Sequence, residues 1–165
     1  MQKHLFFICP SDSLEGKINL AYSESNLFIS SIGNSIVFDQ STSLEINGLI
    51  GKQGIAEITF VLSTDNRIVQ DACQEQRFRD VKGMQSFYAE IIKHKELAER
   101  TWQSDVPIPL VSSMYLQRKR EELLSSIDKN LIDHIKVNHS IYCRRESRFQ
   151  EIAPELLRRT LFCLN

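Results

Sequence analysis

The stretch with the most chemical potential is a polar corner, Ser63 to Asn66, which directly follows an apolar run from Ile55 to Leu62. The run is rich in strand-favouring residues and predicts a buried strand. In an α/β fold, the carboxyl end of such a strand is where binding and catalytic side chains are usually placed. The corner offers Ser, Thr, Asp and Asn, but it contains neither His nor Cys.

Two further corners follow the other predicted strands. His4 to Cys9 predicts a buried strand that Pro10-Ser11-Asp12-Ser13 interrupts with residues typical of turns. Residues 26–31 predict a second strand, and Gly33-Asn34 then tolerates the positive φ that a tight corner needs. Two interpretations stay open for these polar side chains: they line a pocket, or they only satisfy backbone groups at neighbouring turns.

Other potential nucleophiles and ligands are scattered. The histidines show no HxH or HxxH spacing, and the cysteines show no CxxC pair; they are His4, His94, His134 and His139, and Cys9, Cys73, Cys143 and Cys163. We expect free buried thiols rather than disulfides or a metal site. We expect Arg144-Arg145 and Arg158-Arg159 to be solvated rather than to bind an anion, and no glycine-rich phosphate motif is present.

The overall composition is that of an ordinary globular protein. The chain has 165 residues, 42% hydrophobic and 25% charged, with a formal net charge of −1. This length fits one domain, predicted over residues 1–165. The near-neutral charge argues against nucleic acid as a partner, and no apolar run is long enough to span a membrane. We expect a cytoplasmic protein.

The elements that must position these corners alternate between strands and helices. Thr42 and Glu45 predict a capping box for a helix that ends near Gly51. Further predicted elements are helices over 66–76, 84–102 and from Ser112 or Ser113 to about 126, a linker over 106–109, strands over 135–142 and 148–152, and a last helix from Pro154 to about Phe162. This order predicts an α/β fold with a small, mostly parallel sheet, flanked by helices, and one antiparallel edge strand.

Five segments resemble β-class carbonic anhydrases when taken together, and one of them, Ser43-Leu44-Glu45, resembles the start of the helix after that family's second strand. Residues 5–13 look like that family's first strand, which ends in Cys-x-Asp-Ser-Arg, and residues 26–34 look like the strand that ends Arg-Asn-Ala-Gly-Asn. Residues 60–66 resemble the strand that ends Gly-His-Thr/Ser-Asp-Cys-Gly, and residues 135–152 resemble the terminal strand pair. The resemblance implies strand order 2-1-3-4 with an antiparallel edge strand, and a homodimer.

The resemblance fails at the residues that hold the family's zinc. Aligned without a gap, the first ligand position falls on Pro10, and Cys9 lies one place earlier. The His position falls on Ser63 and the second Cys position on Asn66, neither of which is a normal zinc ligand. The family's Asp–Arg pair is also broken, since Leu14 stands where the Arg would follow Asp12.

We therefore expect a carbonic-anhydrase-like pseudoenzyme that has lost its zinc site, with no catalytic residue, metal or cofactor. Its remnant pocket would bind a small anion or metabolite, or the protein would serve as a dimeric interaction scaffold. The expected pocket residues are Cys9, Pro10, Asp12, Gly33, Asn34, Ser63, Asp65 and Asn66.

Two alternatives remain. One is an active zinc-dependent carbonate dehydratase, a lyase with rearranged ligands such as Cys9 with Asp12 or Asp65; zinc would be a cofactor only in that case. The other is an unrelated nucleotide-binding α/β module, which would lack a phosphate motif.

Overall fold

The protein is built on a five-stranded sheet with the order β2-β1-β3-β4-β5. The structure is a computed structural model and describes residues 3–22 and 25–150. β1, β2, β3 and β4 are parallel to their neighbours, and β5 runs antiparallel to β4 at the edge. The predicted fold class and strand order are confirmed. The strands are β1 (Lys3–Ile8), β2 (Asn26–Ser30), β3 (Ile55–Ser63), β4 (Lys136–Cys143) and β5 (Arg148–Gln150).

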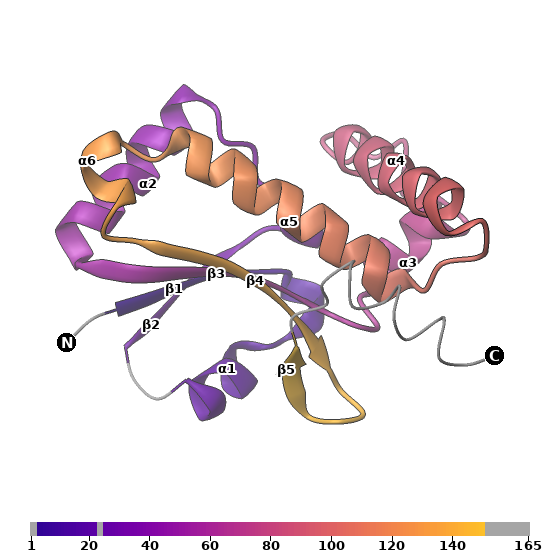
Figure 1. Ribbon diagram of the computed structural model, residues 1–165, viewed down its shortest axis with the longest axis horizontal. Helices are drawn as coiled ribbons and strands as arrows, with labels where there is room; N and C mark the ends of the chain where they lie inside the picture. The colour runs from indigo at the N-terminus through magenta and orange to yellow at the C-terminus, as the bar shows by residue number, and fades with distance from the viewer. Residues whose placement is uncertain (1–2, 23–24, 151–165) are drawn as a thin grey trace.

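Helical segments connect these strands and lie on both faces of the sheet (Figure 1). Short 3-10 turns η1 (Pro10–Asp12) and η2 (Ile32–Asn34) follow β1 and β2. The helices are α1 (Glu15–Ala21), α2 (Gln40–Gln53), α3 (Arg67–Cys73), α4 (Gln85–Trp102), α5 (Ile108–Ser126) and α6 (Lys129–Ile132). None of the helices in the described part of the chain combines the length and apolar character that crossing a membrane requires.

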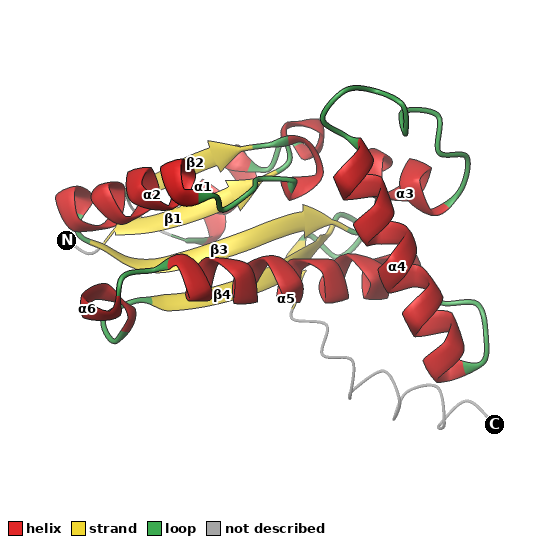
Figure 2. Cartoon of the chain, turned by 90° about the horizontal axis from the view of Figure 1, so that it is seen from above, coloured by secondary structure: helices red, strands yellow, loops and turns green. Residues whose placement is uncertain are grey.

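The side chains of each strand alternate between two separate cores. Leu5, Phe7 and Phe60 point to a large core that also contains apolar side chains from α2, α3, α4 and α5. Phe6 and Val61 point the opposite way, into a smaller core closed by α1. Figure 2 shows α5 running along the sheet beside β3 and β4. On the face opposite α5, Ile18 of α1 packs against Phe6, Ile8 and Val61. The same face carries the polar side chains of His4, Glu57 and Thr59 nearer the amino ends of β1 and β3.

Several predicted helix limits are wrong, for local reasons. α5 begins at Ile108 rather than at Ser112 or Ser113, because Pro109 occupies the first turn, where a missing N–H costs no hydrogen bond. The helix predicted over 66–76 is shorter, and α6 was not predicted. The predicted helix from Pro154 to about Phe162 lies outside the described residues.

α2 is longer at both ends than its sequence signals suggested. Its N-cap is Asp39, whose Oδ1 accepts a hydrogen bond from Thr42 N at 2.8 Å, so Thr42 is not the cap. The helix continues through Gly51 and ends at Gln53, where Gly54 adopts the left-handed conformation with φ of 64°. Gly54 has this role because a residue with a Cβ is strained at such a φ.

The two glycines give a direct test of where α2 ends. Gly51→Ala should stabilise the protein by about 0.5–1 kcal/mol, because alanine loses less backbone entropy inside a helix. Gly54→Ala should destabilise it by about 1 kcal/mol, because alanine is strained in the left-handed region. Neither new Cβ would contact another residue within 4 Å, so packing does not confuse the comparison. Urea denaturation measures both changes in stability. If Gly51→Ala destabilised the protein and Gly54→Ala stabilised it, the helix would end at Gly51 instead.

Candidate functional site

The corners singled out in the sequence all lie at the carboxyl ends of the strands. β1, β2 and β3 are parallel, so η1, η2 and the corner 63–66 follow carboxyl ends that are next to one another. The predicted pocket residues there are buried, except for Pro10 and Asp65, which are exposed. The structure therefore brings the set together, and the hydrogen bonds decide what it can do.

The centre of this corner is a buried contact between Asp12 and Ser63. Asp12 Oδ2 accepts a hydrogen bond from Ser63 N at 2.9 Å, and Asp12 Oδ1 accepts one from Ser63 Oγ at 2.7 Å. Asp12 is 2% exposed and Ser63 is 1% exposed. Both carboxylate oxygens are thus satisfied by one residue, and the contact ties the end of β1 to the end of β3.

Asn66 is committed to helix capping. Its Oδ1 accepts hydrogen bonds from Ile68 N at 3.1 Å and Val69 N at 2.9 Å, which are free donors in the first turn of α3. Its Nδ2 donates to Ser11 Oγ at 3.5 Å. The side chain is 1% exposed, so its oxygen is not available to a ligand without loss of the cap.

Cys9, and not Pro10, faces the corner. Cys9 Sγ accepts a hydrogen bond from Gly33 N at 3.1 Å and lies 3.0 Å from Ser11 Oγ. Since Ser11 also contacts Asn66, a short polar chain joins Cys9 to the start of α3. Pro10 is the first residue of η1 and is exposed.

Gly33 and Asn34 hold the neighbouring corner. Gly33 has φ of 62°, and a Cβ there would lie 2.6 Å from Cε2 of Phe87, so two constraints favour glycine. Asn34 Nδ2 donates to Val61 O at 2.8 Å, and its own carbonyl oxygen accepts from Tyr115 Oη at 3.0 Å. These contacts fasten η2 to β3 and α5.

Arg144 joins the corner from the hairpin between β4 and β5. Its Nε pairs with Asp65 Oδ1 at 2.9 Å, and its guanidinium also donates to the carbonyl oxygen of Asp12. Burial acts to raise the pKa of Asp65, but the nearby Ser63 hydroxyl and the hydrogen bond and charge of Arg144 outweigh it, and the pKa lies below its ordinary value. Sequence reasoning expected a solvated turn at Arg144, because nothing in the local sequence reveals which corner a hairpin will reach.

The donor set at this corner does not fit a zinc ion. The atoms at or beside the three expected ligand positions are one thiol, a serine hydroxyl and a carboxamide oxygen that already accepts two backbone hydrogen bonds. The carboxylates of Asp12 and Asp65 are bonded to Ser63 and Arg144, respectively. Within residues 3–22 and 25–150, no three His, Cys, Asp or Glu side chains are grouped so that they could hold a metal. Two of the histidines lie away from the corner: His4 Nε2 is 2.8 Å from Thr59 Oγ1, and His139 Nε2 is 3.4 Å from Ser113 Oγ of α5.

Solved structures with the same fold are β-carbonic anhydrases. The chain superposes on the enzyme CafA of Aspergillus fumigatus with a TM-score of 0.69 and 14% identity, covering 99% of this chain and 83% of that one. A tetrameric β-carbonic anhydrase of Sordaria macrospora gives 0.72 and 12%, covering 92% and 81%. CafD of A. fumigatus gives 0.70 and 15%, covering 93% and 90%. No protein-family model matches the sequence, and no curated protein matches it either.

The Asp12–Ser63 contact can be tested by a double-mutant cycle. Asp12→Ala should cost about 3 kcal/mol, because it leaves the buried Ser63 N–H without an acceptor, and Ser63→Ala should cost about 1–2 kcal/mol. The double variant should lose less than the sum, since the two changes remove one shared contact. Asp105→Ala, at an exposed loop position, is the matched control. Additive losses in urea denaturation would show that the two residues act separately.

The Asp65–Arg144 pair predicts a pH dependence of stability. A carboxylate with a lowered folded-state pKa stabilises the fold above its unfolded pKa of about 3.9, and that contribution is lost as pH falls through the folded value. The difference in stability between the wild type and Asp65→Asn should therefore shrink as pH falls below about 4 and through the lowered folded-state pKa. Arg144→Met should abolish most of this difference at pH 7. A difference that stays constant with pH would contradict the assignment.

Proposed function

We propose that this protein is a carbonic-anhydrase-like pseudoenzyme, zinc-free and without carbon dioxide hydration, whose former metal corner now serves as a structural junction. The observation that carries the proposal is the pair of hydrogen bonds from Ser63 to Asp12. In the resemblance to β-carbonic anhydrases, Ser63 occupies the position of a zinc-binding His. Here its hydroxyl and its amide both serve to join two strands.

The missing ligands matter because zinc supplies most of the chemistry of carbon dioxide hydration. Such a site needs three protein ligands and an open position for water. The metal lowers the pKa of that water from about 15.7 to about 7, which makes hydroxide available at neutral pH. Among the residues at this corner, no side chain provides a comparable effect, so none is proposed as catalytic.

The same contacts argue against the alternative with rearranged ligands. That reading needs Cys9 together with Asp12 or Asp65. A zinc ion would have to replace the bond from Gly33 N to Cys9 Sγ, and either the two bonds of Asp12 or the ion pair of Asp65 with Arg144. Each replacement would release a group that now holds the ends of the strands together.

The role that we propose is interaction through a homodimer, in a single domain and in the cytoplasm. One of the structural neighbours is described as a tetramer, which makes self-association a natural expectation. Among the residues that the structure describes, β2 pairs with β1 alone and forms an edge of the sheet. The exposed apolar side chains Ile32, Val37 and Leu44 lie in the segment that follows it. A small anion or metabolite at the corner is the less favoured role, because most of the polar side chains there already bond to one another or to the backbone, although Ser31 Oγ and Asn34 Oδ1 are buried without a hydrogen-bond partner in the described part of the chain.

Metal analysis of protein purified without chelators tests the central claim. We expect far less than one zinc per chain and no carbon dioxide hydration above the buffer rate, including after incubation with zinc. Size-exclusion chromatography with light scattering on the same sample reports the oligomer. Stoichiometric zinc whose removal abolishes hydration would overturn the proposal in favour of the lyase.

Restoring ligands tests how the corner corresponds to a zinc site. The double variant Ser63→His with Asn66→Cys should gain zinc affinity, because the sulfur of Cys9 already faces this corner. Adding Cys9→Ser should remove most of the gain, whereas adding Pro10→Cys should change it little, since Pro10 is exposed. Circular dichroism establishes that each variant is folded. A folded double variant that binds no zinc would contradict the correspondence.

A further inference from the structure

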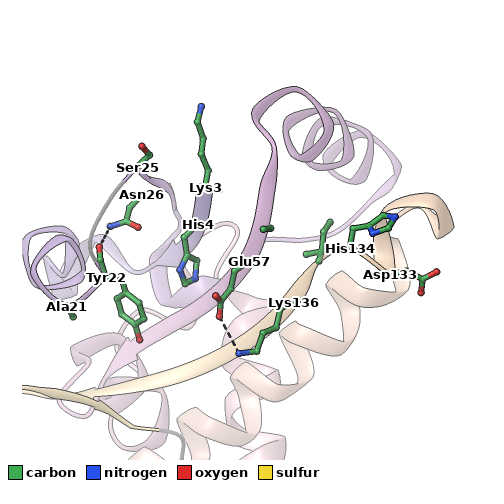
Figure 3. Close-up of a pocket in the computed structure, with 12 residues that line it drawn as sticks. Lys3, His4, Ala21, Tyr22, Ser25, Asn26, Glu57, Asp133, His134 and Lys136 are labelled. Atoms are coloured by element: carbon green, nitrogen blue, oxygen red, sulfur yellow. Dashed lines mark hydrogen bonds and ion pairs between the residues drawn. The ribbon is translucent and has the colours of Figure 1, made fainter. Parts of the chain in front are cut away.

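A groove lies at the amino ends of the strands, which is the opposite end of the sheet from the corner. It is on the face of the sheet that α1 packs against. Its volume is about 780 Å³, which is ample for a small metabolite. Figure 3 shows its lining, with His4, Tyr22, Glu57 and Lys136 turned toward a common space and Lys3 turned away. These side chains come from three strands and from the end of α1.

The register of the sheet places the central groups side by side. His4 of β1 is opposite Glu57 of β3, and Glu57 is opposite Lys136 of β4. Partners in register project to the same face, so an imidazole, a carboxylate and an ammonium form a row across three strands. This convergence arises from residues 53 and 79 positions apart in the chain, which is why no local motif reveals it.

Part of the hydrogen-bonding capacity of this row is unused. His4 Nε2 contacts Thr59 Oγ1 at 2.8 Å, and Glu57 Oε1 accepts from Asn138 and lies 3.7 Å from Lys136 Nζ. Among the described residues, Glu57 Oε2 and His4 Nδ1 have no hydrogen-bond partner. The side chain of Lys136 is 72% exposed, and its ammonium forms one ion pair among the described residues, the 3.7 Å contact with Glu57 Oε1. The ammonium therefore has donors left for a ligand.

The charges that line the groove balance one another. Of the charged side chains turned toward the common space, Glu57 is negative and Lys136 is positive. Burial acts to lower the pKa of His4, so its imidazole is neutral at pH 7 and offers a hydrogen bond rather than a charge. A ligand with only one sign of charge would leave half of this set unpaired, whereas a zwitterion satisfies both halves.

The spacing narrows the kind of zwitterion. The carboxylate and the ammonium of the row lie 3.7 Å apart, so the ligand must present its own two charges close together. An α-amino acid does this, since one carbon separates its ammonium from its carboxylate. Tyr22 packs edge-on to His4, with 5.4 Å between ring centroids, and gives an aromatic wall for an apolar side chain.

We propose that this groove binds an α-amino acid with an apolar or aromatic side chain. Its ammonium pairs with Glu57, its carboxylate pairs with Lys136, and its side chain lies against Tyr22. The site is separate from the corner that contains Asp12 and Ser63, so a test of amino acid binding is independent of a test of the pseudoenzyme proposal.

Isothermal titration calorimetry with three matched probes tests the ligand class. L-phenylalanine carries both charges, phenethylamine only the ammonium, and 3-phenylpropanoate only the carboxylate. We expect L-phenylalanine to bind at least about tenfold more tightly than either analogue, because each charge-assisted contact contributes that much. Equal affinity for 3-phenylpropanoate would mean a plain anion site, and no binding of L-phenylalanine at about 10 mM would mean no amino acid site. Either result overturns the proposal.

Two variants locate the binding on the full-length protein. Glu57→Gln keeps an acceptor for Asn138 but removes the negative charge, and Lys136→Met removes the ammonium from an exposed position. Each should weaken binding of L-phenylalanine by about tenfold. Glu96→Gln and Lys129→Met remove the same charges at exposed positions outside the groove and should leave binding unchanged. Binding that Glu57→Gln and Lys136→Met leave intact, with the fold verified by circular dichroism, would contradict the assignment.

Discussion

The structure depends on one buried contact, the carboxylate of Asp12 held by the amide and hydroxyl of Ser63. A buried carboxylate is costly unless its oxygens are satisfied, and here a single residue on the neighbouring strand satisfies both. The contact fixes the end of β1 to the end of β3, the two central strands. Arg144 extends it to the β4–β5 hairpin, since its guanidinium bonds the backbone of Asp12.

The two ends of the sheet differ in how many of their polar groups remain available to a ligand. At the carboxyl end, polar side chains are buried and bond mainly to one another, so they stabilise the strand ends and leave few groups for a ligand. At the amino end, Glu57 and Lys136 lie in a groove with unused donors and acceptors. The carboxyl end is where an α/β fold usually places its chemistry. In this protein, the groove that we propose as a ligand site lies instead at the amino ends of the strands.

Local patterns in the sequence were enough to predict the fold class and the residues that follow each strand. The alternation of apolar runs with helical stretches predicted a mostly parallel sheet with one antiparallel edge strand. The strand order was implied by the resemblance to β-carbonic anhydrases, and it agrees with the observed order and with the fold of the solved structures. Helix limits were less accurate, because Asp39 and Gly54 define the ends of α2 through side-chain and backbone geometry that competing signals at Thr42 and Gly51 imitate.

What the sequence by itself determined is which side chains end each strand: Asp12 after β1, and Ser63, Asp65 and Asn66 after β3. Ser63 and Asn66 stand at two of the expected ligand positions, and neither residue has the thiolate or imidazole group that zinc prefers. Only the tertiary structure decided how these groups are used and that Arg144 joins them. The same holds for the row of His4, Glu57 and Lys136, which depends on register between strands far apart in the chain. Hydrogen bonds and registers of this kind are set by packing over the whole sheet, and no local pattern encodes them.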